Sequence, residues 1–158
     1  MIITRTGEES FKIKTRDAEI ILTPESLEID SFVIDGPGEY ERKNIFVEVP
    51  FEKTAFKVLV EEISILYPSR TKKFTDVEIE ELDGVDLLFL PGGENDSMSL
   101  KDALELSATL EPNITIPYDY ADIETLKKSG IEGETTKSAK ISKATMPAEG
   151  NQIIFLEK

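Results

Sequence analysis

Cysteine and histidine are both absent from this 158-residue sequence. The absence of cysteine excludes disulfides, thiolate nucleophiles, iron–sulfur clusters and thiolate zinc sites. The absence of histidine removes the usual general base, the usual transition-metal ligand and every catalytic arrangement that pairs histidine with serine or cysteine. The most common routes to nucleophilic catalysis and to zinc binding are therefore closed to this chain.

Positive charge is scarce as well. The chain has 18 lysine and arginine residues against 32 aspartate and glutamate residues, which gives a formal net charge of −14. Proteins that bind nucleic acid attract the phosphate backbone with cationic patches, and a protein this acidic would repel it. The sequence therefore predicts no nucleic-acid partner, and we interpret the acidity as an aid to solubility rather than as a binding surface.

Long hydrophobic runs are missing too, since the longest apolar stretches have the length of one strand, and we expect no membrane span. Met1-Ile2-Ile3-Thr4 leads into alternating sequence and not into a basic region with an apolar signal core, so a cytoplasmic location is expected. With 39% hydrophobic residues, the composition is typical of a globular protein. Residues 1–158 are predicted to form a single domain with a real core.

Residues 83–120 predict a strand, a turn, a helix and a second strand. The apolar run 85–90 is stopped by Pro91-Gly92-Gly93, and the apolar run 114–116 ends at Pro117. Ser99 is the expected N-cap of the helix, and Pro112 ends it. A helix between two buried strands implies a parallel pair with a right-handed crossover. One helix face is formed by Leu100, Ala103, Leu104, Ser107 and Ala108.

The first half of the chain predicts an antiparallel meander or half of a sandwich. Turns are expected at Thr6-Gly7 and Arg16-Asp17, a short acidic connection over 25–31, and a sharp reversal over 35–40. The expected strands follow the apolar runs near 11–13, 20–22, 32–34, 45–47, 55–60 and 63–67.

Shorter elements are expected on either side of the crossover unit. Thr75 is the expected N-cap of a helix over 76–82, and a second amphipathic helix over 122–129 is stopped by Gly130. Beyond it, the pattern indicates a strand within 131–136, weak signals over 137–146 and a final strand over 153–156.

Four segments, taken together and in order, carry a family resemblance. They are TGEESFKIKTRDAEIILTP, VIDGPGEYERKNIFVEVP, FTDVEIEELDGVDLLFLPGG and LEPNITIPYDY. In this combination the chain resembles the metallo-β-lactamase-fold proteins of the predicted zinc-dependent hydrolase group. The resemblance implies an α/β fold, an αββα sandwich of two face-to-face sheets with helices outside. It also implies that this chain is a shortened member.

The same resemblance implies that the metal ligands are gone. Members carry a His-x-His-x-Asp-His run after the early hairpin, where this chain has only ESLEIDSF between Pro24 and Val33. Glu8 stands where the family has a histidine, Ser69 where a bridging aspartate is expected, and Asp119 where the last histidine precedes a tyrosine, here Tyr120. These four residues, Glu8, Ser69, Asp119 and Tyr120, are the candidates for a vestigial cleft.

Two functions are compatible with this reading. The first is a non-catalytic protein with no metal and no cofactor, which keeps the scaffold for self-association as a homo-oligomer or for binding a partner. The second is a hydrolase of phosphodiesterase or lactonase type, in which carboxylates replace the imidazoles and hold Mg²⁺, Mn²⁺ or Ca²⁺. A third alternative is a small-molecule ligand bound in the vestigial cleft without reaction.

Other polar groups are interpreted as structural. Residues 91–96 lie where α/β folds often bind phosphate, but Glu94 and Asp96 oppose an anion, and a structural turn is expected. Asp35 and Glu39 flank a second turn, which we also interpret as structural. The remaining groups are expected to be solvated or only partly buried: the acidic pairs Glu8-Glu9 and Glu61-Glu62, the basic cluster Arg70, Lys72 and Lys73, and the tyrosines Tyr67, Tyr118 and Tyr120, with buried rings and wet hydroxyls.

Overall fold

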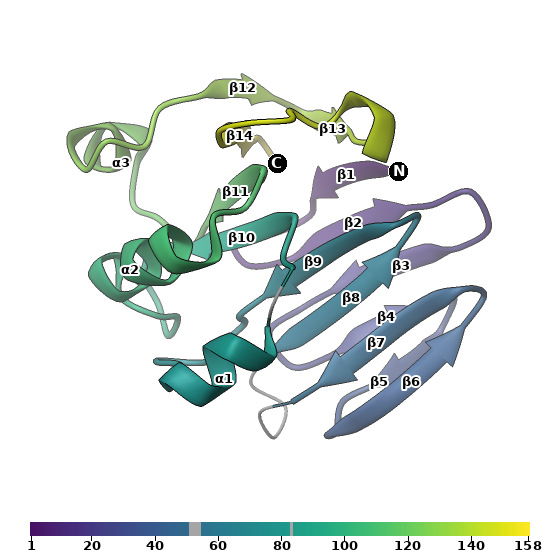
Figure 1. Ribbon diagram of the computed structural model, residues 1–158. Coiled ribbons are helices and arrows are strands. Elements are labelled where there is room, and N and C mark those ends of the chain that lie inside the picture. The colour runs from purple at the N-terminus through teal and green to yellow at the C-terminus, as the bar shows by residue number, and fades with distance from the viewer. Residues whose placement is uncertain (51–54, 83) are drawn as a thin grey trace.

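Two β-sheets pack face to face, and helices cover the outer face of one of them (Figure 1). The computed structural model describes residues 1–50, 55–82 and 84–158. In the described part, none of the helices is long and apolar enough to cross a membrane.

The six-stranded sheet is antiparallel throughout. Its spatial order is β13 (Ser138–Lys140), β1 (Ile2–Arg5), β2 (Phe11–Lys14), β3 (Glu19–Leu22), β4 (Leu27–Ile29) and β5 (Phe32–Ile34). The predicted turns at Thr6-Gly7 and Arg16-Asp17 are confirmed. The prediction of an irregular connection over 25–31 is wrong, because Leu27 and Ile29 alternate as buried residues of β4. Asp30 and Ser31, both with positive φ, then make a tight turn into β5.

The eight-stranded sheet is mixed. Its order is β12 (Glu134–Thr136), β14 (Gln152–Leu156), β11 (Ile114–Tyr118), β10 (Leu87–Pro91), β9 (Ile63–Tyr67), β8 (Phe56–Val60), β7 (Ile45–Val49) and β6 (Gly38–Arg42). Strands β6 to β9 form an antiparallel meander, and the pairs from β9 to β12 are parallel. The predicted parallel pair around the crossover helix is therefore confirmed as β10 and β11. Pro117 does not end the second strand, since β11 continues to Tyr118.

The turn over 35–40 links the two sheets. Residues 35–37 lead from β5 in one sheet to β6 in the other, so the expected sharp reversal is shorter than predicted, and β6 begins at Gly38. Gly38 has φ 141°, which a side chain would disfavour. The Tyr40 hydroxyl donates a hydrogen bond to the Gly36 carbonyl at 2.9 Å and closes the turn.

Capping side chains begin each helix. Thr75 and Glu78 form a capping box at α1 (Asp76–Glu81), and Ser99 accepts a hydrogen bond from the Asp102 N–H at the start of α2 (Leu100–Leu110). Asp122 caps α3 (Ile123–Lys128), and Gly130 follows that helix with φ 87°. All three predicted helices are thus confirmed. The weakly patterned stretch after them holds β13 and a 3₁₀ turn, Lys143–Thr145.

Two hydrophobic clusters hold these layers together. The larger lies between the sheets and includes Phe11, Tyr67, Phe89 and Tyr118, all fully buried. The smaller lies between the eight-stranded sheet and the helices, and Leu66, Leu88, Met98 and Leu106 belong to it. The predicted two-sheet sandwich is confirmed in its truncated form: within the described residues, α1 to α3 all pack on the outer face of the eight-stranded sheet.

Candidate functional site

The carboxyl ends of three neighbouring strands meet the turn between β1 and β2. Ser69 follows β9, Gly92 follows β10 and Asp119 follows β11. The Asp119 N–H donates to the Glu8 carbonyl at 3.3 Å, and the Gly92 N–H donates to the Tyr118 carbonyl at 2.8 Å. In open α/β sheets, this edge is where ligands usually bind. The fold therefore brings the predicted cleft residues to one end of the sandwich.

Asp119 is the centre of this end. Its side chain is buried, with 1% of the residue exposed, and its backbone has φ 52°, in the left-handed region that aspartate tolerates better than most residues. The carboxylate accepts hydrogen bonds from the Asn95 N–H at 3.0 Å, the Asn95 side-chain amide at 2.5 Å and the Ser97 hydroxyl at 2.7 Å. Both carboxylate oxygens are thus already engaged by donors of the protein itself.

The loop between β10 and α2 supplies these donors. A Cβ atom on Gly92 would lie 2.7 Å from the Asp119 carbonyl oxygen, so only glycine allows the loop to come this close. Gly93 has φ 73°, and its N–H donates to the Ser97 hydroxyl at 3.1 Å. The loop folds around a carboxylate, and the prediction that it is a structural turn agrees with this geometry.

Ser69 links the end of β9 to the six-stranded sheet through a hydrogen bond. The residue is fully buried, and its hydroxyl donates to the Pro24 carbonyl at 2.6 Å. Its own carbonyl accepts a hydrogen bond from the Tyr118 hydroxyl at 3.1 Å. A serine hydroxyl committed to a buried carbonyl has a structural role here.

Glu8 and Tyr120 form a separate group around Arg5. The Glu8 carboxylate is half-exposed and pairs with Arg5 at 3.2 Å and with Lys158, whose hydrogen bond is the main cause that holds the pKa of Glu8 below its ordinary value. The Arg5 guanidinium lies 5.3 Å from the centre of the Tyr120 ring. The backbone of Glu8 therefore contacts Asp119 through a hydrogen bond, while the Glu8 carboxylate is held by Arg5 and Lys158.

Glu9 and Arg70 are the site residues that the sequence did not reveal. The Glu9 side chain is 11% exposed and pairs with Arg70 at 3.1 Å; Arg70 also reaches Asp96 at 3.4 Å and Glu25 at 3.9 Å. Burial, and next the charge of Asp119, raise the pKa of Glu9. Within the described residues, Glu9 Oε1 and Arg70 Nε are buried without a hydrogen-bond partner.

The solvated interpretation of these groups is therefore wrong for Glu9 and for Arg70, while it holds for Glu8. Glu8 and Glu9 both lie in the bend between β1 and β2, so strand alternation does not predict which of them faces inward. The pairing of Glu9 with Arg70, 61 positions away, has no local signal in the sequence. Lys72 also has a partner, since its ammonium binds the Asp96 carboxylate at 2.6 Å.

Two of the tyrosines are more deeply buried than expected. Tyr67 and Tyr118 are fully buried, and their hydroxyls donate to the carbonyls of Glu9 and Ser69. The expectation of wet hydroxyls is wrong for both, because backbone carbonyls replace water as acceptors. Burial raises the pKa of each tyrosine well above its ordinary range, so neither ionises near neutral pH.

These residues do not fit a catalytic zinc ion. Such a site needs about three protein ligands with free lone pairs and an open position for water. Ser69 donates its hydroxyl to a carbonyl, Asp119 is saturated by neutral donors, and Glu8 is held by cations. Among residues 1–50, 55–82 and 84–158, no group of three acidic side chains is arranged to hold a metal ion.

Two β-sheets pack face to face, and polar residues gather at the carboxyl ends of β9, β10 and β11. This arrangement is that of a metallo-β-lactamase fold. The sequence model of the beta-lactamase superfamily domain matches residues 3–119, and the chain belongs to this family. A metal-dependent hydrolase from Enterococcus faecalis is 41% identical over 61 residues, which are 38% of this chain and 27% of that protein. The chain therefore aligns with about a quarter of this relative's length.

A solved structure matches the complete sandwich. A Thermotoga maritima protein of the metallo-beta-lactamase superfamily, described as a candidate zinc-dependent hydrolase, superposes with a TM-score of 0.82 at 18% identity. The match covers 99% of this chain and 100% of that one, so the shortened form of the fold fits a chain of this size. At this identity the likeness establishes the fold alone.

Proposed function

We propose that this protein is a non-catalytic member of its family that serves as a self-associating or partner-binding scaffold. The observation that carries the proposal is the hydrogen bonding of Asp119, the residue at a former ligand position. Its oxygens accept from Asn95 and Ser97 at 2.5–3.2 Å. A metal ion at this carboxylate would compete with these donors, and the buried Ser97 hydroxyl would then lose its acceptor.

Arg70 supports the same conclusion. Its guanidinium carries the positive charge that neighbouring carboxylates require, and it lies within 4 Å of Glu9, Asp96 and Glu25. An arginine cannot lose its proton in a protein, so it cannot make room for a cation by becoming neutral. Arg70 therefore offsets part of the negative charge of these carboxylates and occupies the space beside them that a divalent ion would need.

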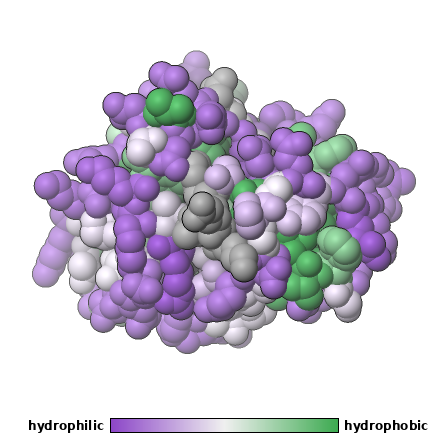
Figure 2. All heavy atoms as spheres, turned by 90° about the horizontal axis from the view of Figure 1, so that it is seen from below, coloured by the Kyte–Doolittle hydropathy of each residue, from purple (hydrophilic) through white to green (hydrophobic). Residues whose placement is uncertain are grey.

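The surface for self-association is at the opposite end of the sheets. Two large apolar side chains on the outer face of the eight-stranded sheet, Phe46 of β7 and Leu59 of β8, are 48% and 46% exposed. Phe46 and Leu59 are directly paired across β7 and β8, and they line a hollow of about 380 Å³. Figure 2 shows hydrophobic side chains gathered at the right of the view, the side on which Figure 1 places β5 and β6. Apolar area of this kind is commonly covered by a second copy.

The first experiment tests for metal. Elemental analysis of the unchelated protein should find no stoichiometric metal, and Zn²⁺, Mn²⁺, Mg²⁺ and Ca²⁺ should leave the melting temperature unchanged, since only a ligand that binds the folded state raises it. Phosphodiester and lactone substrates should not be turned over. A saturable thermal shift with one of these ions, lost in Asp119→Ala, would overturn the non-catalytic proposal in favour of a carboxylate-bound hydrolase.

The second experiment tests self-association. Sedimentation velocity over a concentration series should detect a dimer that Phe46→Ser and Leu59→Ser together weaken at least tenfold. Val77→Ser is the matched control: Val77 is 65% exposed on α1, outside the hollow that Phe46 and Leu59 line. A wild-type protein that remains monomeric at every concentration would contradict the self-association part and leave the metal result standing.

A further inference from the structure

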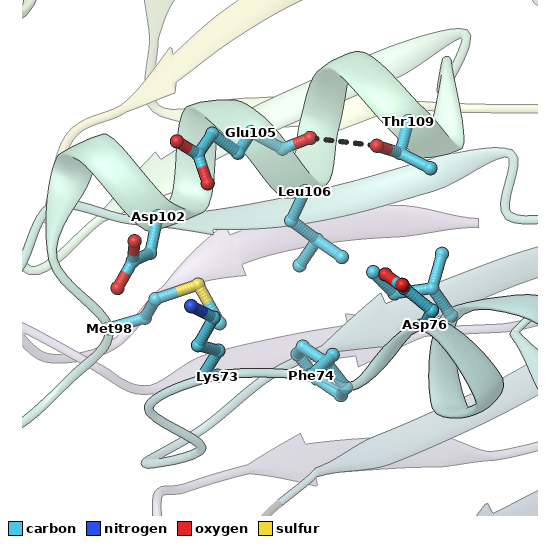
Figure 3. A pocket seen from close by; sticks show the side chains of 9 residues that line it. Lys73, Phe74, Asp76, Met98, Asp102, Glu105, Leu106 and Thr109 are labelled. Atoms are coloured by element: carbon cyan, nitrogen blue, oxygen red, sulfur yellow. Dashed lines mark hydrogen bonds between the residues drawn. The ribbon is translucent and has the colours of Figure 1, made fainter.

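A groove lies between α1 and α2 on the helical face of the molecule. Its volume is about 290 Å³. Buried apolar side chains form its floor: Phe74, Met98 and Leu106 are 6%, 1% and 4% exposed, and Ile79 of α1 lines one wall. Figure 3 shows Leu106 pointing from α2 into the space between Met98 and Phe74. The groove therefore has an apolar floor that is nearly covered, with the partly exposed Ile79 as its main accessible apolar side chain.

The rim of the groove is acidic. Asp102 and Glu105 of α2 and Asp76 of α1 line it, against the single cation Lys73. In the described part of the chain, none of these three carboxylates takes part in an ion pair. Asp76 and Asp102 lie in first helical turns, where they also complement the helix dipole. Glu105 is in the middle of α2 and has no such role.

The size of the groove limits what can fill it. Small-molecule pockets usually measure about 300–1,000 Å³ and bury most of their ligand. This groove is at the lower limit, and it is open along the two helices, so it suits one or two apolar side chains of a longer segment. A second copy of this chain is a poor occupant of this particular groove, because Asp76, Asp102 and Glu105 would have to pair with a chain that has 18 basic against 32 acidic residues.

We propose that this groove binds a basic peptide segment of another protein. An apolar anchor side chain of the segment packs on Phe74, Met98 and Leu106, and flanking lysine or arginine residues pair with Asp76, Asp102 and Glu105. This is the helix-in-groove mode of recognition combined with charge complementarity. The proposal rests on the partner-binding part of the proposed function and names the chemistry of the partner.

The probe is a fluorescent amphipathic peptide of leucine and lysine, with leucines at i, i+3, i+4 and i+7. Its binding is followed by anisotropy in buffer of physiological ionic strength. Binding to the wild-type protein should saturate at one peptide per chain. A peptide with serine in place of leucine should bind at least about tenfold more weakly, a loss of about 1.4 kcal/mol, because it lacks the apolar anchor.

A charge-matched pair of double variants separates the groove from general acidity. Asp102→Asn with Glu105→Gln removes two charges from the rim, and Glu132→Gln with Glu149→Gln removes two charges from exposed positions elsewhere. The rim variant should weaken binding about tenfold and the control variant less than twofold. Circular dichroism and the melting temperature verify that both variants are folded.

Three outcomes would overturn the proposal: no saturable binding to the wild-type protein, equal losses in both double variants, or equal affinity of the leucine and serine peptides. Ile79→Ala is a further test, because it changes an apolar wall and leaves the rim charges intact. It should weaken binding of the leucine peptide but not of the serine peptide. Because the dimer surface and Asp119 are not altered in these variants, failure here leaves the metal and sedimentation results interpretable on their own.

Discussion

At the scale of single residues, the Asp119 side chain holds the polar end of the sandwich together through its hydrogen bonds to Asn95 and Ser97. It is buried, it has a left-handed backbone, and it orients Asn95 and Ser97 through its carboxylate. A buried acceptor with a charge strengthens each of these hydrogen bonds relative to a neutral one. Asp119 therefore anchors the loop between β10 and α2.

Asp119→Ala should lower the free energy of unfolding by about 1–3 kcal/mol, because the buried Ser97 hydroxyl would lose its acceptor and the loop would lose its hydrogen bonds from Asn95. Urea denaturation measures the change. Asp119→Asn should cost less, since asparagine tolerates the same backbone conformation and keeps one side-chain oxygen. Equal stability of wild type and Asp119→Ala would show that the loop does not depend on this carboxylate.

Glu9 gives a prediction for pH dependence. Burial, and then the charge of Asp119, raise its pKa above the ordinary value of 4.5 in the folded protein. The folded state therefore holds more protons than the unfolded state between these two pKa values, and the contribution of Glu9 to stability falls as the pH rises through that window.

Glu9→Gln removes this titration. We define the difference in melting temperature as the variant's value minus the wild-type value. This difference should become more positive as the pH is raised from 4 to 7. Glu8→Gln is the matched control and should change in the opposite direction below pH 4.5, because the pKa of Glu8 is lowered, mainly by the hydrogen bond from Lys158. A difference for Glu9→Gln that does not vary with pH would mean that Glu9 titrates normally in the folded protein.

At the level of secondary structure, the connection from β10 to α2 decides the shape of the polar end. Gly92 allows the loop to lie against the end of β11, where a Cβ atom would be 2.7 Å from the Asp119 carbonyl and 2.8 Å from the Tyr120 Cβ. Both contacts are with backbone or with the base of a side chain, so neither can relax by a rotamer change.

Gly92→Ala should therefore destabilise the protein by about 1–3 kcal/mol, the usual cost of overpacking. Gly7→Ala is the control in another loop: its added Cβ would meet Ser10 at an ordinary 3.5 Å, and the variant should be close to neutral. Thermal unfolding of both variants provides the comparison. If the two variants have the same melting temperature, the close approach of the loop to β11 does not contribute to stability.

At the scale of the whole molecule, the net charge of −14 opposes the association of two copies. Two copies repel each other through their summed charge, and salt screens this repulsion as the Debye length falls from about 10 Å at 0.1 M to about 3 Å at 1 M. The apolar contact made by Phe46 and Leu59 is not weakened by screening.

Dimerisation should therefore tighten as NaCl is raised, whereas binding of the basic peptide to the α1–α2 groove should weaken. Sedimentation velocity and anisotropy along the same salt series measure the two effects. Opposite trends are the expected result. A dimer that dissociates with rising salt would point to an interface built from ion pairs, and the apolar surface would then not be the site of contact.

Local patterns predicted much of this fold. The parallel β10–α2–β11 unit and the helix caps Thr75, Ser99 and Asp122 depend on residues close in sequence, and the structure reproduces them. Strand β4 was missed because its three residues were read as part of an acidic linker, although Leu27 and Ile29 show the alternation of a strand. Short strands carry too few residues for that signal to be distinctive.

The structure places Glu8, Ser69 and Asp119 at one end of the sandwich, and whether they form a functional cleft stays a prediction. Each of the three makes a structural hydrogen bond or ion pair there. Glu9 and Arg70, which form the ion pair beside them, come from segments 61 positions apart, and that pairing has no local signature.

Composition and short-range pattern were enough to establish that this chain offers no imidazole or thiol to a metal, and that it builds strands and capped helices in this order. No fold can supply a missing functional group, and caps and turns act within a few residues. Only the tertiary structure decided that Glu9 rather than Glu8 faces Arg70, and that the oxygens of Asp119 are taken by Asn95 and Ser97. Those contacts depend on how two sheets and one loop are packed, and that packing places groups far apart in sequence within hydrogen-bond distance of each other.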